Sequence, residues 1–159
     1  MPKSNFERMI QLAGEVFDVK SDPDQLDVDE KVIARLQEIH PSTVSEFDDG
    51  KGPVIWILLI PTSLELMEEF LAKRISEKEL FQRTQPHQSY GAIYLCSAMV
   101  LEEFRGKGIA KRMTIEAIEN IRKDHPVKKL FVWPFSKEGD GLAETIAKST
   151  SLPLLKRLS

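Results

Sequence analysis

The segment from Ala92 to Lys123 constrains the fold more than any other part of the chain. Ala92 to Val100 is an apolar run that is typical of a strand, and residues from about Lys107 to Lys123 have the spacing of an amphipathic helix. A short loop with two glycines and two basic residues joins them. The first turn of a helix cannot pair its own N–H groups, and the helix dipole adds partial positive charge there. This strand, loop and helix therefore predict an anion site suited to phosphate.

The remaining segments alternate between helical and extended patterns. In chain order we expect helices over 4–17 and 29–39, strands over 43–47 and 54–60, helices over 62–75 and 76–81, a strand over 92–100, a helix over 107–123, a strand over 129–133 and a helix over 140–148. Residues 152–158 are expected to be extended but too short for a hairpin. This order predicts a mixed α/β fold in a single domain, with a helical part over 1–41 and a core over 42–159.

Two capping boxes mark expected helix starts. They begin at Ser4 and Thr62, each followed three residues later by a glutamate, and Ser76-Glu77-Lys78-Glu79 is expected to start a further short helix. In the first helix, the apolar residues at helical spacing are expected to form the buried face. These residues are Phe6, Met9, Ile10, Ala13 and Phe17.

Charge and composition narrow the ligand classes. The net charge is −3, but residues 97–159 hold 12 Lys and Arg against 8 Asp and Glu, so residues 1–96 hold 10 against 17. A carboxyl-terminal part with a net charge of +4 fits a small phosphorylated ligand, and the excess is too small to predict nucleic-acid binding. The single cysteine, Cys96, excludes an intrachain disulfide framework and a multi-cysteine zinc site, and it is expected to be a buried, inert thiol. No metal is predicted.

No segment predicts contact with a membrane. The start of the chain lacks the pattern of a signal peptide, and the longest apolar run, Val54 to Ile60, is too short to span a bilayer. We therefore expect a cytoplasmic protein without a membrane partner.

The loop resembles the signature of the GNAT superfamily of acyl-CoA-dependent N-acyltransferases. That signature is (Gln/Arg)-x-x-Gly-x-(Gly/Ala) at a strand-to-helix junction, and Arg105-Gly106-Lys107-Gly108-Ile109-Ala110 matches it in full. The resemblance extends from about Ala92 to Trp133, roughly a quarter of the chain. It implies a mixed central sheet flanked by helices, with strands that splay around a coenzyme A cleft, and here with additional amino-terminal helices.

The resemblance also implies a role for each matching residue. The loop, over 105–111, would bind the pyrophosphate of coenzyme A, and the preceding strand would pair with the pantetheine arm. The Val100 N–H would polarise the thioester carbonyl. The residues implied to bind acetyl-CoA or another acyl-CoA are Ala98, Met99, Val100, Arg105, Gly106, Lys107, Gly108, Ile109, Ala110 and Lys111.

Three positions depart from the family pattern. Tyr94 occupies the place of a glutamate base, Ala147 that of a tyrosine acid, and Glu102 that of a proline. Tyr94 is the candidate catalytic side chain, although a phenol is a poor base at neutral pH. Two functions therefore stay open, beside a third interpretation as a phosphate-packed structural domain that binds no coenzyme. One is acyl transfer from acetyl-CoA to an amine of unknown identity by direct attack, and the other is coenzyme A binding by a sensor or assembly module without turnover.

For other candidate site residues, both a structural and a functional interpretation are open. Ser136 and Ser149 could replace the missing acid, but caps or loop positions are the simpler interpretation. His87 lies in a polar segment, 84–89, from which it could enter a cleft. The sequence lacks two parts of the family's sheet, a strand before the first helix and a two-strand hairpin after the last one. We therefore expect an open sheet edge, which a homodimer or the amino-terminal helices would cover.

Overall fold

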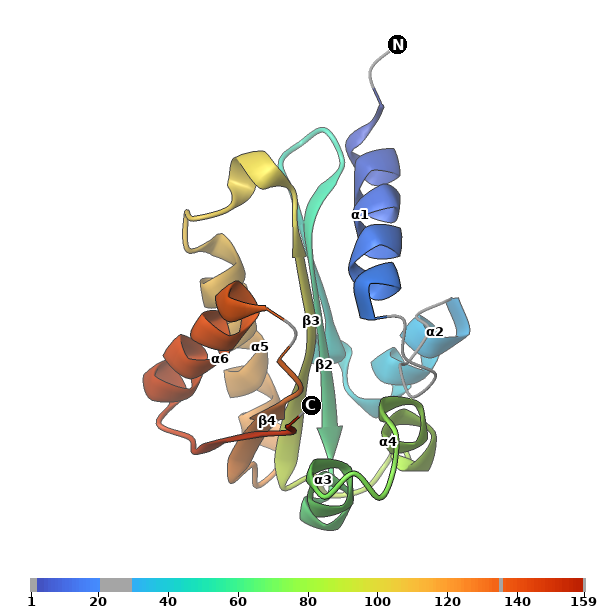
Figure 1. The fold of residues 1–159 in the computed structure, drawn as a ribbon, viewed down its shortest axis with the longest axis vertical. Helices are drawn as coiled ribbons and strands as arrows, with labels where there is room; N and C mark the ends of the chain where they lie inside the picture. The colour runs from blue at the N-terminus through green and yellow to red at the C-terminus, as the bar shows by residue number, and fades with distance from the viewer. Residues whose placement is uncertain (1–2, 21–29, 135, 159) are drawn as a thin grey trace.

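The structure is a computed structural model, and it describes residues 3–20, 30–134 and 136–158, with side chains from 16 to 20 left out. Helices lie on both sides of one sheet (Figure 1). The helices are α1 (Asn5–Lys20), α2 (Glu30–Ile39), α3 (Leu64–Leu71), α4 (Glu77–Arg83), α5 (Ile109–Asp124) and α6 (Lys137–Thr150), with short 3-10 turns η1 (Pro41–Thr43) and η2 (Glu102–Phe104). The strands are β1 (Val44–Asp48), β2 (Pro53–Thr62), β3 (Ala92–Val100), β4 (Lys129–Val132) and β5 (Leu154–Lys156).

The five strands form one mixed sheet in the order β1-β2-β3-β4-β5. β1, β2 and β3 are antiparallel neighbours, whereas β3, β4 and β5 are parallel. Parallel neighbours need a crossover connection, and α5 and α6 provide the two crossovers. In Figure 1, α5 and α6 lie on one side of the sheet, and α1, α2 and α4 lie on the other.

The core is centred on β2, whose residues are buried on both faces except for the half-buried Trp56. This explains its run of apolar residues without alternation, because helices cover the sheet on each side. From α5, Ala117, Ile118 and Ile121 are buried against one face. From the other side Met9 and Leu36 are completely buried, which fixes α1 and α2 to the sheet.

Much of the expected secondary structure is confirmed. The hairpin forms with β1 and β2 in register from Val44–Leu58 to Asp48–Pro53, and the apolar run over 92–100 is β3. The Ser4 hydroxyl accepts a hydrogen bond of 3.1 Å from the Glu7 N–H, and Ser76 forms a complete capping box with Glu79. Cys96 is buried, as expected.

Several boundaries and faces differ from the expectation. α3 is capped by Ser63 instead of Thr62, and it ends at Leu71, so Ile75 lies outside it. α6 begins at Lys137, three residues earlier than expected, because the Ser136 hydroxyl accepts from the Gly139 N–H and caps the helix. On α1, Phe6 is 56% exposed and Ile10 is 52% exposed, so the expected buried stripe is wrong at these two positions. The side chain of Phe17 lies outside the described residues.

The carboxyl-terminal segment is part of the sheet. Leu154 to Lys156 form β5, which pairs in parallel with Leu130 to Val132 of β4. The sequence pattern predicted an extended segment over 152–158, but not its pairing with β4 as a fifth strand. Within the described ranges, no helix is long and apolar enough to cross a membrane.

Candidate functional site

Strands β3 and β4 part soon after they meet. Their parallel pairing runs only from Ala92–Lys129 to Tyr94–Phe131, although β3 continues to Val100. In the described part of the chain, no strand pairs with Leu95 to Val100 on this side. A bulge lies within the same stretch, because Leu58 and Leu59 of β2 pair with Ser97 and Leu95 and leave Cys96 as the extra residue.

The backbone of β3 presents hydrogen-bonding groups on this open side. The Leu101 N–H donates to the Val54 carbonyl at 3.0 Å across the β2 side. Successive residues of an antiparallel strand alternate in direction, so the N–H and C=O groups of Val100 and Ala98 face away from β2. Those of Met99, which pairs with Trp56, face β2 instead. Of the three strand residues implied to bind the cofactor, Ala98 and Val100 thus present free-edge backbone groups and Met99 does not.

The glycine loop follows this free edge. Gly106 and Gly108 have φ angles of 74° and 76°, in the left-handed region that favours glycine. A side-chain carbon at either position would meet no atom within 4 Å, so the loop faces open space. Gly108 is the N-cap of α5 and has no side chain to cap it. The first bond of this helix is from the Arg112 N–H to the Gly108 carbonyl, which leaves the N–H groups of Ile109, Ala110 and Lys111 outside the helical ladder.

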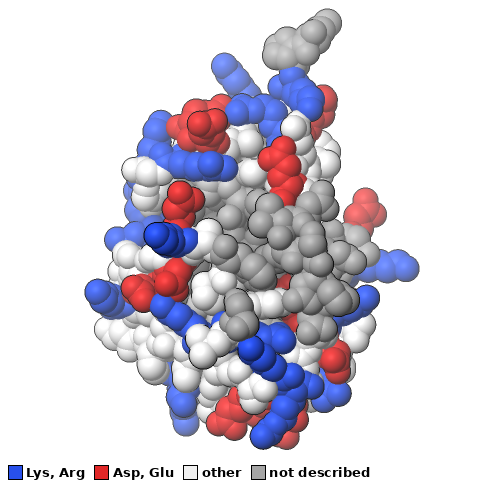
Figure 2. All heavy atoms as spheres, in the orientation of Figure 1, with Lys and Arg blue, Asp and Glu red and all other residues white. Residues whose placement is uncertain are grey.

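Basic side chains surround the loop. Arg105, Lys107 and Arg112 are exposed, and Lys111 is half-buried. The Arg105 Nε donates a hydrogen bond of 3.0 Å to the Val100 carbonyl, which ties the loop to the end of β3. The Lys107 ammonium lies 5.4 Å from the centre of the Phe104 ring. On the face seen in Figure 2, Lys and Arg alternate with Asp and Glu, so the positive charge there is local and does not form a broad basic surface.

Tyr94 lies at the point where β3 and β4 part, and its environment opposes a role as a base. The side chain is 1% exposed, and its hydroxyl donates a hydrogen bond of 2.5 Å to Glu77 Oε2. Burial and the neighbouring Glu77 and Cys96 raise the pKa of Tyr94 well above its ordinary value of 10.0. The phenol therefore keeps its proton at neutral pH and acts as a hydrogen-bond donor.

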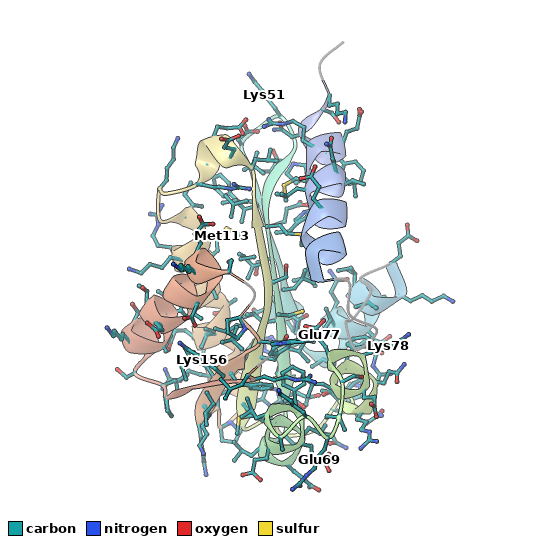
Figure 3. The ribbon with its side chains drawn as sticks, in the orientation of Figure 1. Lys51, Glu69, Glu77, Lys78, Met113 and Lys156 are labelled. Atoms are coloured by element: carbon teal, nitrogen blue, oxygen red, sulfur yellow. The ribbon has the colours of Figure 1, made fainter. Side chains whose placement is uncertain are left out.

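Glu77 is a buried carboxylate that the sequence pattern did not single out. It is the first residue of α4, and it is completely buried. In Figure 3, Glu77 points toward the sheet, whereas the neighbouring Lys78 points outward. The only sequence signal was its place within the Ser76 capping box, which explains the helix start but not the direction of this side chain.

Aromatic rings and one guanidinium enclose the same point. Phe70 of α3 packs against Tyr94, Phe131 and Trp133, with ring centres 5.0, 5.8 and 6.2 Å away. Arg157, just after β5, lies 4.5 Å from the centres of the Phe70 and Trp133 rings. Trp133, just after β4, is buried in this cluster.

Ser136 has the capping role that was its simpler interpretation, whereas Ser149 lies within α6 and is neither a cap nor a loop residue. Ser136 caps α6, Ala147 is buried within it, and Ser149 is exposed on its last turn. His87 is exposed in its loop with a φ of 63°. His40 is buried, and it accepts from the Ser42 N–H through Nδ1 and bonds Asp124 through Nε2 at 2.7 Å. His125 ends α5 and packs against Tyr90 with ring centres 4.6 Å apart.

The described residues contain no group of three or more His, Cys, Asp or Glu side chains arranged to hold a metal ion. A hollow of about 310 Å³ lies on the other flank of α5, between it and β1, and none of the residues implied for coenzyme A lines it. The candidate site is thus the free edge of β3 and the loop that follows it.

Compared with models of protein families, the chain matches none. No curated protein matches it either.

Proposed function

We propose that this protein binds an acyl-CoA and transfers its acyl group, acetyl in the first instance, to a primary amine. The proposal rests on one observation, that the free edge of β3 leads directly into the glycine loop. An unpaired strand edge, with the N–H groups of Ala98 and Val100 turned outward, leads directly into a two-glycine loop at the start of α5. An extended pantetheine arm can pair with such an edge, and a pyrophosphate can accept from the amides that follow it.

Each part of the loop has a physical role in this proposal. The N–H groups of Ile109, Ala110 and Lys111 would donate to the phosphates, and glycines at 106 and 108 let the backbone approach them. Lys107 and Arg112 would add positive charge at the rim. The resemblance of the loop to the GNAT signature supports coenzyme A over other phosphorylated ligands.

The acyl end of the ligand would lie along β3. A thioester carbonyl next to the outward N–H of Val100 would accept a hydrogen bond that strengthens as negative charge develops on the oxygen. The amine would then attack the carbonyl carbon directly, and the nitrogen would lose a proton to water. The C–S bond would break as the carbonyl re-forms, and coenzyme A would leave as a thiolate that takes up a proton from water. Positioning of the two reactants supplies the main rate advantage in this scheme. Tyr94 keeps its proton and takes no part as a base.

A second function is supported by the closed surroundings of Tyr94. The phenol, Glu77 and the Phe70 ring fill the point where β3 and β4 part, on the side of α3 and α4. A domain of this kind could bind coenzyme A or acyl-CoA as a sensor or an assembly module without turnover. A panel of amines with acetyl-CoA separates the two functions, because only the enzyme releases free coenzyme A in an amine-dependent manner.

Calorimetric titration with acetyl-CoA and with coenzyme A tests the binding that both functions share. We expect binding by the unaltered protein and none by Gly108→Glu up to on the order of 1 mM, since the new carboxylate would stand among the N–H groups that receive the phosphates. Gly141→Glu is the matched control, because it adds the same charge to α6 at a position with no atom within 4 Å. Circular dichroism establishes that both variants are folded. Equal affinity in the Gly108→Glu variant would refute the assignment of the loop.

A further inference from the structure

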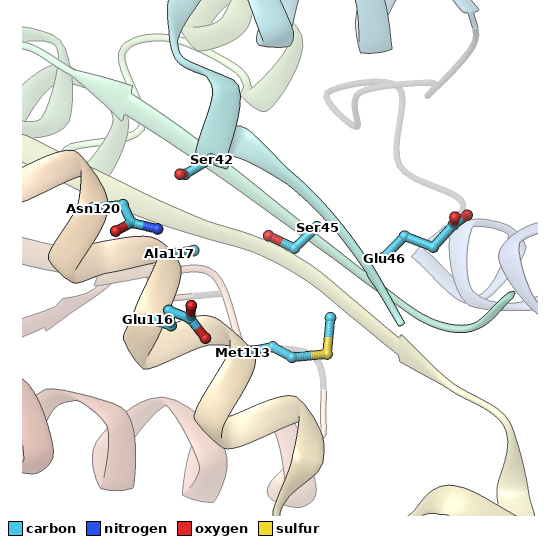
Figure 4. Close-up of a pocket in the computed structure, with 7 residues that line it drawn as sticks. All are labelled: Ser42, Ser45, Glu46, Met113, Glu116, Ala117 and Asn120. Atoms are coloured by element: carbon cyan, nitrogen blue, oxygen red, sulfur yellow. The ribbon is translucent and has the colours of Figure 1, made fainter. Parts of the chain in front are cut away.

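The hollow between β1 and the outer flank of α5 is a second candidate surface. Figure 4 shows Ser42 and Ser45 directed toward the helix, with Met113, Glu116 and Asn120 on the helix side that faces them. The full lining is Ser42, Ser45, Glu46, Met113, Glu116, Ala117 and Asn120. The surface shares no residue with the proposed coenzyme A site, so it requires an explanation of its own.

The strand beside this hollow has an open edge. β1 is the first strand in the sheet order, and within the described ranges it pairs with β2 alone. Because Val54 bonds toward β3, the alternation along β2 turns Ile55 and Ile57 toward β1, where they pair with Phe47 and Ser45.

The same alternation leaves the N–H and C=O groups of Val44 and Glu46 facing outward, on the unpaired side of β1. Val44 and Ser45 are half-buried and Glu46 is exposed. An extended segment could therefore add to the sheet here as a sixth strand.

The side chains around the edge determine which segment would fit. Glu116 provides a carboxylate on the helix side of the hollow, and the lining contains no Lys or Arg. Ser42, Ser45 and Asn120 add hydroxyl and amide groups. The Glu46 side chain points away from the hollow (Figure 4), and its carboxylate accepts a hydrogen bond of 2.7 Å from Trp56 Nε1. The hollow is therefore polar and carries one carboxylate, that of Glu116, which favours a cationic side chain beside it.

A second copy of the chain is a poor occupant. Pairing of β1 with its own counterpart would bring Glu46 and Asp48 of one copy near the same carboxylates of the other. A short strand that carries charged side chains resists pairing with an identical edge. A segment with Lys or Arg at alternate positions would avoid this repulsion.

We propose that the outer edge of β1 and the adjacent hollow bind a basic peptide in an extended conformation. Its backbone would exchange hydrogen bonds with Val44 and Glu46, which gives affinity without dependence on side chains. Alternate side chains would pass Ser45 and place a Lys or Arg beside Glu116. This proposal does not depend on coenzyme A binding, because the two surfaces share no residue.

A synthetic peptide of roughly seven residues, the length of an ordinary strand, tests this proposal. The probe alternates Lys with Val and has blocked ends, and a matched peptide has Glu in place of Lys. Titration into the ¹⁵N-labelled protein should shift the amide signals of Ser42, Ser45, Glu116 and Asn120 and should slow hydrogen exchange at Val44 and Glu46. The Glu-containing peptide should cause none of these changes.

Two variants at exposed helix positions complete the test. Glu116→Lys should weaken binding of the Lys peptide by about tenfold, the effect of one charge-assisted contact. Glu138→Lys, on α6, makes the same charge change elsewhere and should leave the affinity unchanged. The proposal is overturned if the Lys peptide shifts none of the named signals, or if Glu116→Lys binds it as well as the unaltered protein does. It is also overturned if the β1 signals shift with protein concentration alone, which would identify a second copy as the occupant.

Discussion

The Nε of Arg105 lies 3.0 Å from the carbonyl oxygen of Val100 and donates a hydrogen bond to it. This contact joins the first residue of the glycine loop to the last residue of β3. It holds the loop amides at a set position relative to the free strand edge. In the proposed complex, one coenzyme A molecule contacts both the glycine loop and the free edge of β3.

Replacement of Arg105 tests this link. Arg105→Ala should weaken acetyl-CoA binding by about tenfold, because the loop loses both its anchor and a positive charge. Arg105→Gln keeps a donor and should retain part of the affinity. Calorimetry measures both, and thermal unfolding separates a loss of binding from a loss of fold. The account of the loop fails if Arg105→Ala binds acetyl-CoA with unchanged affinity.

An ion pair connects α1 to η2, the turn before the loop. Arg8 Nη1 and Nη2 donate to the two carboxylate oxygens of Glu103 at 2.6 and 2.7 Å. The hydrogen bonds from Arg8 lower the pKa of Glu103 from its ordinary value of 4.5 to about 2. This stabilisation is fully present above about pH 4.5 and is lost as the pH falls toward about 2.

Glu103→Gln should therefore lower the melting temperature at neutral pH, and the difference from the unaltered protein should shrink as the pH falls below about 4.5. The change should be small, because the pair is exposed to solvent. Glu102→Gln, at the neighbouring carboxylate, is the control. A difference in melting temperature that does not vary with pH would show that the Glu103 charge is not responsible.

Tyr94 and Glu77 provide a prediction about stability. Tyr94→Phe removes a donor from a completely buried carboxylate, and it should reduce the free energy of unfolding by about 1–3 kcal/mol in urea. Tyr90→Phe is a matched control, since the Tyr90 hydroxyl donates to the carbonyl of the exposed Gln85. We expect a smaller loss there. Acetyl-CoA affinity should be unchanged in Tyr94→Phe, and a large loss of affinity would place this phenol in the ligand site.

His125 should make stability depend on pH near neutrality. Burial lowers the pKa of His125 below its ordinary value of 6.5, nearby His40 lowers it further, and Asp124 acts in the opposite direction. The folded state thus disfavours the imidazolium. This contribution is fully present above about pH 6.5 and is lost as the pH falls below that value.

His125→Phe keeps a ring against Tyr90 and cannot titrate, so the melting temperature should fall less between about pH 7 and pH 5 than in the unaltered protein. His87→Asn, in an exposed loop at a positive φ that asparagine tolerates, is the control. An unchanged pH profile in His125→Phe would mean that another group causes the dependence.

Sequence patterns predicted the parts of the fold that are determined locally. Continuous apolar residues identified β2 and β3, and capping residues identified the starts of α1 and α4. Residues 152–158 were predicted to be extended, but the pairing of Leu154 to Lys156 with β4 was not predicted, because it joins segments far apart in the chain. The start of α6 was predicted too late because Gly139 and Gly141 have low helix propensity. The hydrogen bond from the Gly139 N–H to the Ser136 cap offsets that low propensity.

In the candidate site too, the locally determined features could be predicted from the sequence and the long-range contacts could not. The loop geometry at Gly106 and Gly108 follows from local sequence, since both adopt positive φ angles. The free edge of β3 depends on where β4 stops pairing, which involves residues far apart in the chain. The burial of Glu77 against Tyr94 is also a long-range contact, over 17 positions, that no local pattern encodes.

Amide hydrogen exchange with and without acetyl-CoA tests the central claim most directly. If the ligand pairs with the free edge of β3 and its phosphates rest on the loop, saturating acetyl-CoA should slow exchange at Ala98, Val100, Ile109 and Ala110. The N–H of Met99, which already bonds β2, should show little change and serves as the internal reference. Unchanged exchange at Ala98, Val100, Ile109 and Ala110 at saturation would contradict the proposed binding mode.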